Sequence, residues 1–107
     1  MIKITIFYPN IEGAQFDMDY YLTKHMPVSI AKLSASKGYR GVSVEHGVGG
    51  GAPGSDPTYI AMCNYLFDSA EDFLAVFNQH ADLLQADMPN YTDIEPTIQF
   101  SRVEITR

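Results

Sequence analysis

The amino-acid sequence predicts an α+β domain with a four-stranded antiparallel sheet and the element order β-α-β-β-α-β. Four short segments alternate apolar and polar residues or are rich in β-branched and aromatic residues, as strands are. Two longer segments repeat apolar residues every three or four positions, as amphipathic helices do. This order is the split βαβ, or ferredoxin-like, pattern, in which both helices cover one face of the sheet. At 107 residues, the chain suits a single domain, residues 1–107.

The first half of the pattern is a strand followed by a helix. Residues 2–8 (IKITIFY) alternate, and Pro9 with Asn10 then predicts a loop. A helix is predicted from about Asp17, whose charge suits the positive end of a helix dipole, to Gly38, a residue typical of a helix C-terminus. Its buried stripe is expected at Met18, Leu22, Met26, Ile30 and Leu33.

The second half begins with alternating residues 39–48, which predict a strand. Residues 49–57 (GGGAPGSDP) predict a mobile hairpin connection and a candidate lid over a pocket mouth. Further strands are predicted at residues 58–67 and 97–106. Between them a helix is predicted from about Ser69, a favourable N-cap, to Asp87. Its apolar stripe is expected at Phe73, Phe77, His80 and Leu84.

Composition argues against several classes of partner. The formal net charge is −6, and the seven Lys and Arg residues are scattered, which argues against binding to nucleic acid or to an anionic membrane surface. Cys63 is the only cysteine, so no internal disulfide can form. No segment approaches the roughly 20 apolar residues that span a bilayer, and the apolar run at the N-terminus is too short for a signal sequence. We expect a cytoplasmic protein.

The sheet face opposite the helices has no cover within one chain. The predicted strands are apolar on both faces, so a bare face would be an unusually large exposed apolar patch. A second copy packed sheet against sheet would bury it. We therefore expect a homodimer.

Residues 20–30 (YYLTKHMPVSI) combine helical spacing with a proline. Pro27 lacks an N–H and its ring would collide with the Thr23 carbonyl, so we expect the helix to kink or restart there. Backbone polar groups would then be free beside His25, which shares a flank of the helix with Tyr21. One interpretation is a polar niche that opens a pocket. The other is a half-exposed surface histidine.

His80 is a second candidate because it falls within the stripe of the later helix. The plainer interpretation is a core histidine bonded to a backbone carbonyl or a tyrosine. However, both helices cover the same sheet face, so His25 and His80 could line one cavity. Two imidazoles with nearby phenols would make an acid–base pocket at neutral pH. We therefore predict His25, His80, Tyr21 and Tyr91 as catalytic residues.

The remaining reactive residues carry weaker signals. His46 is expected to be structural or exposed, and Cys63 a small buried residue. The three histidines lack the spacing of common zinc sites, so we predict neither a metal nor a bound cofactor.

Two stretches, FDMDYYLTKHMPVSI (16–30) and FNQHADLLQADMPNYTDIEPTIQFSRV (77–103), resemble the EthD family, a branch of the dimeric α/β-barrel superfamily. The resemblance spans essentially the whole chain. It implies a ferredoxin-like protomer, a dimer whose two sheets form a barrel, and a pocket between helices and sheet. The family takes its name from an ethyl tert-butyl ether degradation operon, where its activity is poorly defined. Superfamily relatives include muconolactone isomerases, polyketide cyclases, quinol-forming monooxygenases and haem-handling enzymes, so the fold alone does not choose a function.

Three hypotheses follow, in order of preference. The first is a cofactor-free enzyme that uses acid–base catalysis on a small apolar or aromatic metabolite, by isomerisation, cyclisation, dehydration or oxygenation. The second is a binding protein for an apolar metabolite or for haem, with His25 or His80 as the axial ligand. The third is an interaction subunit whose pocket is filled by Phe73, Phe77 and their neighbours.

Overall fold

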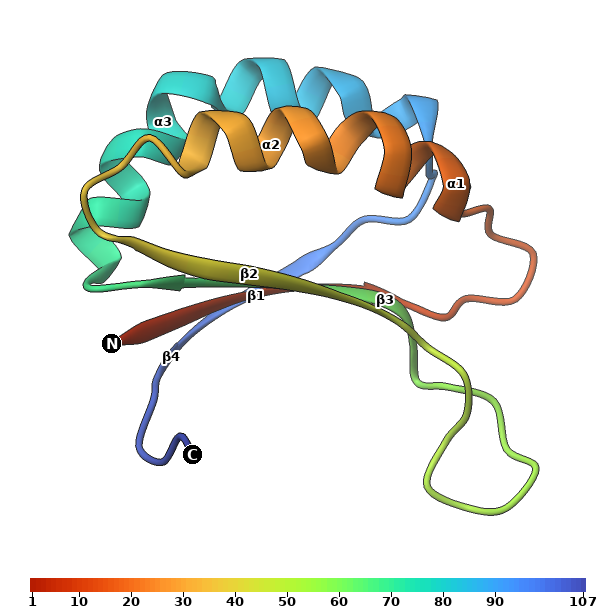
Figure 1. Cartoon of the computed structure of the whole chain (residues 1–107). Coiled ribbons are helices and arrows are strands. Elements are labelled where there is room, and N and C mark those ends of the chain that lie inside the picture. Colours follow the sequence, from red (N-terminus) through yellow and green to blue (C-terminus); the bar gives the residue numbers. More distant parts are fainter.

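The computed structural model describes residues 1–107 and shows one layer of helices above a twisted antiparallel sheet (Figure 1). The sheet has the strand order β2-β3-β1-β4. Its strands are β1 (Ile2–Pro9), β2 (Tyr39–His46), β3 (Tyr59–Phe67) and β4 (Thr97–Arg102). The helices are α1 (Met18–Tyr20), α2 (Met26–Leu33) and α3 (Ala70–Asp87), with a π-helical segment at Tyr21–His25 and a 3₁₀ turn at Met88–Asn90. The predicted ferredoxin-like α+β order is confirmed.

The last strand is shorter than its sequence pattern predicts. Alternation extends to residue 106, but β4 ends at Arg102. Its only neighbour is β1, and the antiparallel register pairs Arg102 with Ile2. Because β1 begins at Ile2, residues beyond Arg102 have no strand to pair with.

The proline in the first helix is accommodated without a break. α1, the π-helical segment and α2 form one rod beside α3 (Figure 1). Within it the N–H of Met26 donates to the Tyr21 carbonyl, five residues back, and Pro27 then occupies the first turn of α2. Proline is well tolerated at such a position, and single π-helical turns inside helices often mark functional sites.

The π-helical segment changes which residues face the sheet. An uninterrupted α-helix predicts Leu22 in the buried stripe, but Leu22 is 47% exposed. Tyr21 and His25 are buried instead. The wider turn contains one residue more than an α-helical turn, so it rotates the preceding residues relative to α2. The predicted position of Leu22 was therefore wrong, and Tyr21 and His25 occupy the inner face.

The first helix also ends earlier than predicted. It stops at Leu33, with Ser34 as its C-cap, and Gly38 has no positive φ. Gly38 is buried against α3, where an added Cβ would lie 2.6 Å from the Cβ of Asp72. Close packing, rather than a helix cap, therefore explains this glycine.

The later helix follows its sequence signals more closely. α3 begins after Ser69, whose hydroxyl accepts a hydrogen bond from the Asp72 N–H at 3.1 Å, as an N-cap does. It ends at Asp87, next to the turn that contains Pro89. None of the helices combines the length and apolarity that crossing a bilayer requires.

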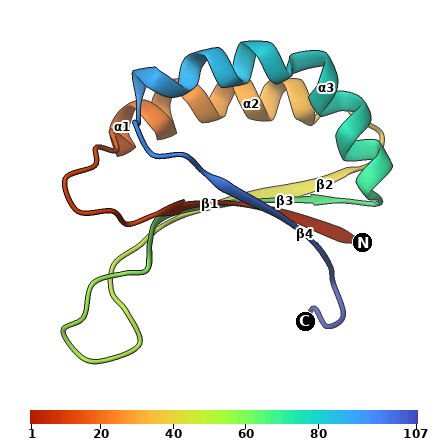
Figure 2. The same ribbon diagram turned by 180° about the vertical axis from the view of Figure 1, so that it is seen from behind.

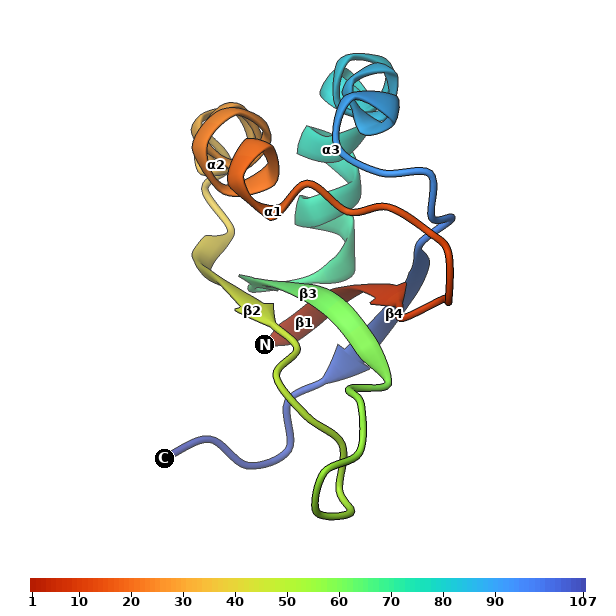
Figure 3. The same cartoon turned by 90° about the vertical axis from the view of Figure 1, so that its right-hand side faces the viewer.

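The core lies between the helices and the sheet and is rich in aromatic rings. Ile4, Tyr65 and Phe67 of the sheet are at most 1% exposed, as is Leu33 of α2. Figure 3 shows the two helical rods above this face of the sheet. These packed residues set the distance between the helices and the sheet. The candidate site lies in the space between these two layers.

The opposite sheet face is uncovered (Figure 2). Its side chains are less apolar than expected. Phe7 and Met62 are half-buried there. Between the strands, however, the Thr5 hydroxyl donates to Asn64 Oδ1 at 2.6 Å, and Asn64 Nδ2 donates to Glu45 Oε1 at 2.6 Å. The face is therefore mixed, with a satisfied polar row across three strands.

The Gly-rich connection does not lie over the pocket. It joins β2 to β3 and extends away from the helices (Figures 1 and 3). None of its residues lines the cavity described below. Its role as a lid within the same chain was therefore a wrong expectation, since it leaves the sheet on the side away from that cavity.

Candidate active site

A cavity of about 1280 Å³ lies between the helices and the sheet. Of the 27 residues that line it, 15 are hydrophobic, so most of its wall would contact hydrocarbon. The rim at β4 is apolar and open, because Ile98 and Phe100 line the cavity and are 51% and 42% exposed. A hollow of this size and character is suited to a small apolar ligand.

His25 is the most reactive side chain on this wall. It is 8% exposed, and its Nδ1 lies 2.9 Å from Asp87 Oδ2. An ionised carboxylate can only accept a hydrogen bond, so Nδ1 carries the proton and donates it to Asp87. In the neutral ring, Nε2 therefore has the free lone pair. No unpaired side-chain nitrogen is sealed from solvent, so Nε2, which has no hydrogen-bond partner within the chain, stays accessible.

Asp87 is held in place at the end of α3. Its Oδ1 accepts hydrogen bonds from the Tyr20 hydroxyl at 2.6 Å and from Asn90 Nδ2 at 2.9 Å. Partial desolvation raises the pKa of Asp87, but the hydrogen bonds from Tyr20, Asn90 and His25 outweigh it and hold the pKa below its ordinary value. Asp87 is thus a fixed anion at neutral pH.

His25 connects two hollows. It borders the large cavity and also a smaller groove of about 200 Å³ between the helices. Asp87 borders only the smaller groove, and its side chain is 27% exposed. The imidazole therefore lies between the large cavity and a carboxylate that reaches solvent.

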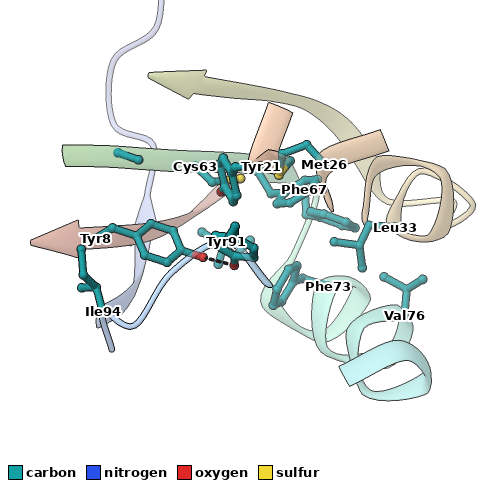
Figure 4. Packing of buried hydrophobic residues seen from close by; sticks show 13 residues of the cluster. Tyr8, Tyr21, Met26, Leu33, Cys63, Phe67, Phe73, Val76, Tyr91 and Ile94 are labelled. Carbon is teal, nitrogen blue, oxygen red and sulfur yellow. Dashed lines mark hydrogen bonds between the residues drawn. The ribbon is translucent and has the colours of Figure 1, made fainter. Parts of the chain in front are cut away.

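Two tyrosines, Tyr21 and Tyr91, pack against the imidazole, and a third, Tyr8, contacts both of them. The Tyr8 and Tyr91 hydroxyls are 2.7 Å apart (Figure 4). The Tyr21 ring stacks on His25 with centroids 5.5 Å apart and planes at 12°, and the Tyr91 ring lies 4.7 Å from the imidazole. This packing restricts the imidazole to one orientation.

These phenols stay protonated at neutral pH. Burial raises the pKa of Tyr8, although the hydrogen bond with Tyr91 partly opposes the rise. Burial also raises the pKa of Tyr21 and of Tyr91 far above the ordinary range of a phenol. Tyr8 and Tyr91 line the cavity, so they can donate hydrogen bonds to a ligand oxygen but are poor bases. Tyr21 borders neither hollow and is 1% exposed.

The structure brings together three of the four residues predicted as catalytic. His25, Tyr21 and Tyr91 are in mutual contact. His80 is half-buried rather than in the core, and it borders neither hollow. His46 is exposed, as expected. The catalytic roles themselves stay predictions.

Two residues of the site, Asp87 and Tyr8, were not among those four. Asp87 occupies the next position of the helical stripe after Leu84, so that stripe already pointed to it. Tyr8 shares the alternating face of β1 with Ile4 and Ile6, which both line the cavity. Both signals were present, but neither showed which partner each side chain meets.

Other reactive groups do not form a site. Nowhere do three or more His, Cys, Asp or Glu side chains gather as they would around a metal ion. Cys63 is 1% exposed, and burial raises the pKa of its thiol to about 12. It therefore behaves as a packing residue rather than a nucleophile.

Comparison with known proteins gives one family. Residues 9–95 match the family model described as the EthD domain. An EthD-like protein from Ralstonia eutropha JMP134 is 43% identical, with 99% of this chain and 94% of that chain covered and a TM-score of 0.90. An ethyl tert-butyl ether (EthD) family protein from Bacillus halodurans C-125 shares the fold at 18% identity, with coverage of 96% and 98% and a TM-score of 0.69. No curated protein matches.

Proposed function

The chain belongs to the EthD family, and from that premise we propose that its cavity catalyses proton transfer on a small, mostly apolar aromatic carbonyl compound. One observation carries the proposal. His25 borders the cavity with Nε2 free, while Asp87 holds the proton on Nδ1 at 2.9 Å. A buried, oriented imidazole with a free lone pair is suited to act as a general base at neutral pH.

The proposed step assigns a role to each polar group. Nε2 of His25 takes a proton from the carbon next to the carbonyl. The C–H electron pair forms the enolate double bond, and the carbonyl π pair moves onto oxygen. The Tyr8–Tyr91 pair holds two hydroxyl hydrogens and needs only one for its internal bond, so the other can donate to the developing oxyanion. Asp87 orients the ring and stabilises the imidazolium that forms.

Several reactions share this first step. Return of the proton to a different carbon completes an isomerisation. Expulsion of a neighbouring hydroxyl as water completes a dehydration, and attack of the enolate on a second carbonyl closes a ring. Reaction of the same enolate with molecular oxygen would give the oxygenase version. The apolar wall of the cavity supports an aromatic or hydrocarbon body for the substrate.

Deuterium exchange tests the shared step directly. The protein is incubated with 1-tetralone in D₂O, and loss of the C2 proton signal is followed by NMR. Wild type should accelerate exchange, and His25→Ala should lose about 100-fold or more of that acceleration. His46→Ala, which removes an exposed histidine, should behave as wild type. Equal exchange by wild type and a folded His25→Ala protein would exclude His25 as the base.

The same experiment examines His80. It borders neither hollow, so the geometry supports a mechanism with one imidazole. If His80→Ala slowed exchange as strongly as His25→Ala, the result would support the mechanism with two histidines that the sequence predicts.

A second candidate function is binding without chemistry. The size and open rim of the cavity favour it, because a ligand could enter and leave past β4. Saturable binding of 1-tetralone without exchange would support this candidate. For haem, the free Nε2 of His25 fits an axial ligand, and a Soret band on mixing with hemin is the test.

We also propose that a second copy of the chain covers the uncovered sheet face. Phe7 and Met62 supply apolar surface there, and the row of Thr5, Asn64 and Glu45 has its hydrogen bonds already satisfied. Such a face can pack against itself without leaving polar groups unpaired. Sedimentation of a monomer at micromolar concentration would contradict the proposal.

A further inference from the structure

A second pair of hydroxyls lines the same cavity. The Ser29 hydroxyl of α2 lies 2.6 Å from the Tyr65 hydroxyl of β3. Both residues line the cavity and are 4% and 1% exposed. The pair holds two hydroxyl hydrogens, and its internal bond uses one. The second hydrogen has no acceptor within the chain, which is unfavourable in an apolar wall unless a ligand or water accepts it.

This pair lies further along the cavity than His25. Tyr65 is opposite Ile4 in the sheet register, whereas Tyr8 is four residues further along β1. Four strand residues span about 13 Å. On the helix side, Ser29 follows His25 by four residues, about one turn or 6 Å along the axis. The two hydroxyl pairs therefore lie at two separate positions along one hollow.

Between the two hydroxyl pairs the floor is apolar. Ile6 of β1 lines the cavity between Ile4 and Tyr8, and it is paired with Cys63 of β3. Phe73 and Phe77 of α3 line the cavity beside Tyr65, with their rings stacked at 5.3 Å and the Phe73 ring 6.5 Å from that of Tyr65. A flat hydrocarbon body fits such walls, while an oxygen atom in the middle would lack a partner.

From this arrangement we infer that the natural ligand is a flat, fused-ring aromatic compound with two oxygen functions, one at each end. The first oxygen is the carbonyl at the His25–Tyr91 end. The second, a hydroxyl or carbonyl, binds Ser29 and Tyr65, which therefore select the substrate. This inference rests on the proposed function for the identity of the first oxygen. The inference of a second oxygen rests only on the hydroxyl pair of Ser29 and Tyr65.

A purely structural role for the pair makes a different prediction. The bond between Ser29 and Tyr65 also ties α2 to β3. If that were its only role, its removal would change stability but not the preference among ligands. A comparison of two probes with one and two oxygens therefore separates the two roles.

The probes are 1-tetralone and 6-hydroxy-1-tetralone, whose added hydroxyl lies at the far end of the fused rings. Titration calorimetry should give wild type a preference of about fivefold to tenfold for the hydroxylated probe, the value of one hydrogen bond. Ser29→Ala and Tyr65→Phe should each abolish that preference. Ser43→Ala, an exposed serine in β2, should retain it.

The outcomes separate the two proposals. Equal affinities in wild type, or a preference that survives in both variants, would overturn this inference, as would failure of both probes to bind. Deuterium exchange with equal affinities would overturn this inference alone. A preference for 6-hydroxy-1-tetralone without exchange would support this inference and overturn the proposed function alone.

Discussion

Replacement of Asp87 by Asn should move the proton of His25 from one ring nitrogen to the other. In wild type the carboxylate can only accept, so Nδ1 carries the hydrogen. In Asp87→Asn the side-chain oxygen can keep its two donors, Tyr20 and Asn90. The amide nitrogen then faces His25 and donates to Nδ1, so the hydrogen must reside on Nε2. The free lone pair on Nε2 would be lost.

The size of this effect follows from the two hydrogen bonds. A bond to a charged group contributes about 1.5–3 kcal/mol, and because the Asp87 side chain is 27% exposed we take the lower end. That value favours Nδ1–H about tenfold. A neutral amide contributes about 1 kcal/mol in the opposite direction, or about fivefold. The tautomer ratio should therefore change about fiftyfold between the two proteins.

Long-range ¹H–¹⁵N NMR at about pH 8.5, where an ordinary imidazole is neutral, reports the tautomer directly. The chain has three histidines, so spectra of His46→Ala and His80→Ala assign the other two rings. Since Tyr20 and Asn90 keep their acceptor, the free energy of unfolding should fall by less than about 1 kcal/mol, a change in Tm of at most about 5 °C.

Either of two spectra would refute this reasoning. One is an Nε2–H ring in wild type, which would mean that Asp87 does not orient His25. The other is an Nδ1–H ring retained in Asp87→Asn. A variant that kept the Nδ1–H tautomer would also be expected to keep deuterium exchange, so the two measurements check each other.

Three other predictions address reactivity, packing and pH. Iodoacetamide should modify Cys63 slowly in the folded protein and rapidly in urea, because the thiol is buried with its pKa raised to about 12; fast labelling of folded protein would contradict the burial. Gly38→Ala should destabilise by about 1–3 kcal/mol in urea unfolding, since its methyl group would overlap Asp72, whereas Gly51→Ala, with open space around it, should not. Asp87 has a lowered folded pKa, so its contribution to stability should be complete above about pH 5 and disappear as pH falls below about 4; a stability difference from Asp87→Asn that is unchanged between pH 6 and pH 3 would refute this.

Much of the fold could be predicted because its signals are local. Alternation predicted β1, β2 and β4, a run of apolar residues predicted β3, and the Ser69 cap predicted the start of α3. The end of β4 could not be predicted in this way, since it depends on where β1 begins, a partner about 100 residues away in the chain.

The site was predictable in part. The motif around His25 and Pro27 marked the right segment, and Tyr21 and Tyr91 meet His25 as anticipated. Two facts required coordinates. The phase of the first helix depends on a π-helical turn that α-helical periodicity does not describe, and the bond between His25 and Asp87 joins residues 62 positions apart. His80 was predicted because it falls within the apolar stripe of α3. Helical periodicity alone does not show how far each residue of such a stripe is buried, and His80 is only half-buried.

The π-helical turn lets the first helical rod hold one extra residue without changing which way its two ends face. Loss of one residue between Tyr21 and His25 would restore α-helical winding, and Tyr21 would then lie four residues before Met26 instead of five. The Tyr21 ring would stay on the inner face, and the fold and nearly all of the core would survive. An alignment of this chain with an α-helical relative therefore needs a one-residue gap at this turn, because without the gap the residue before or after the true counterpart would be matched to Tyr21.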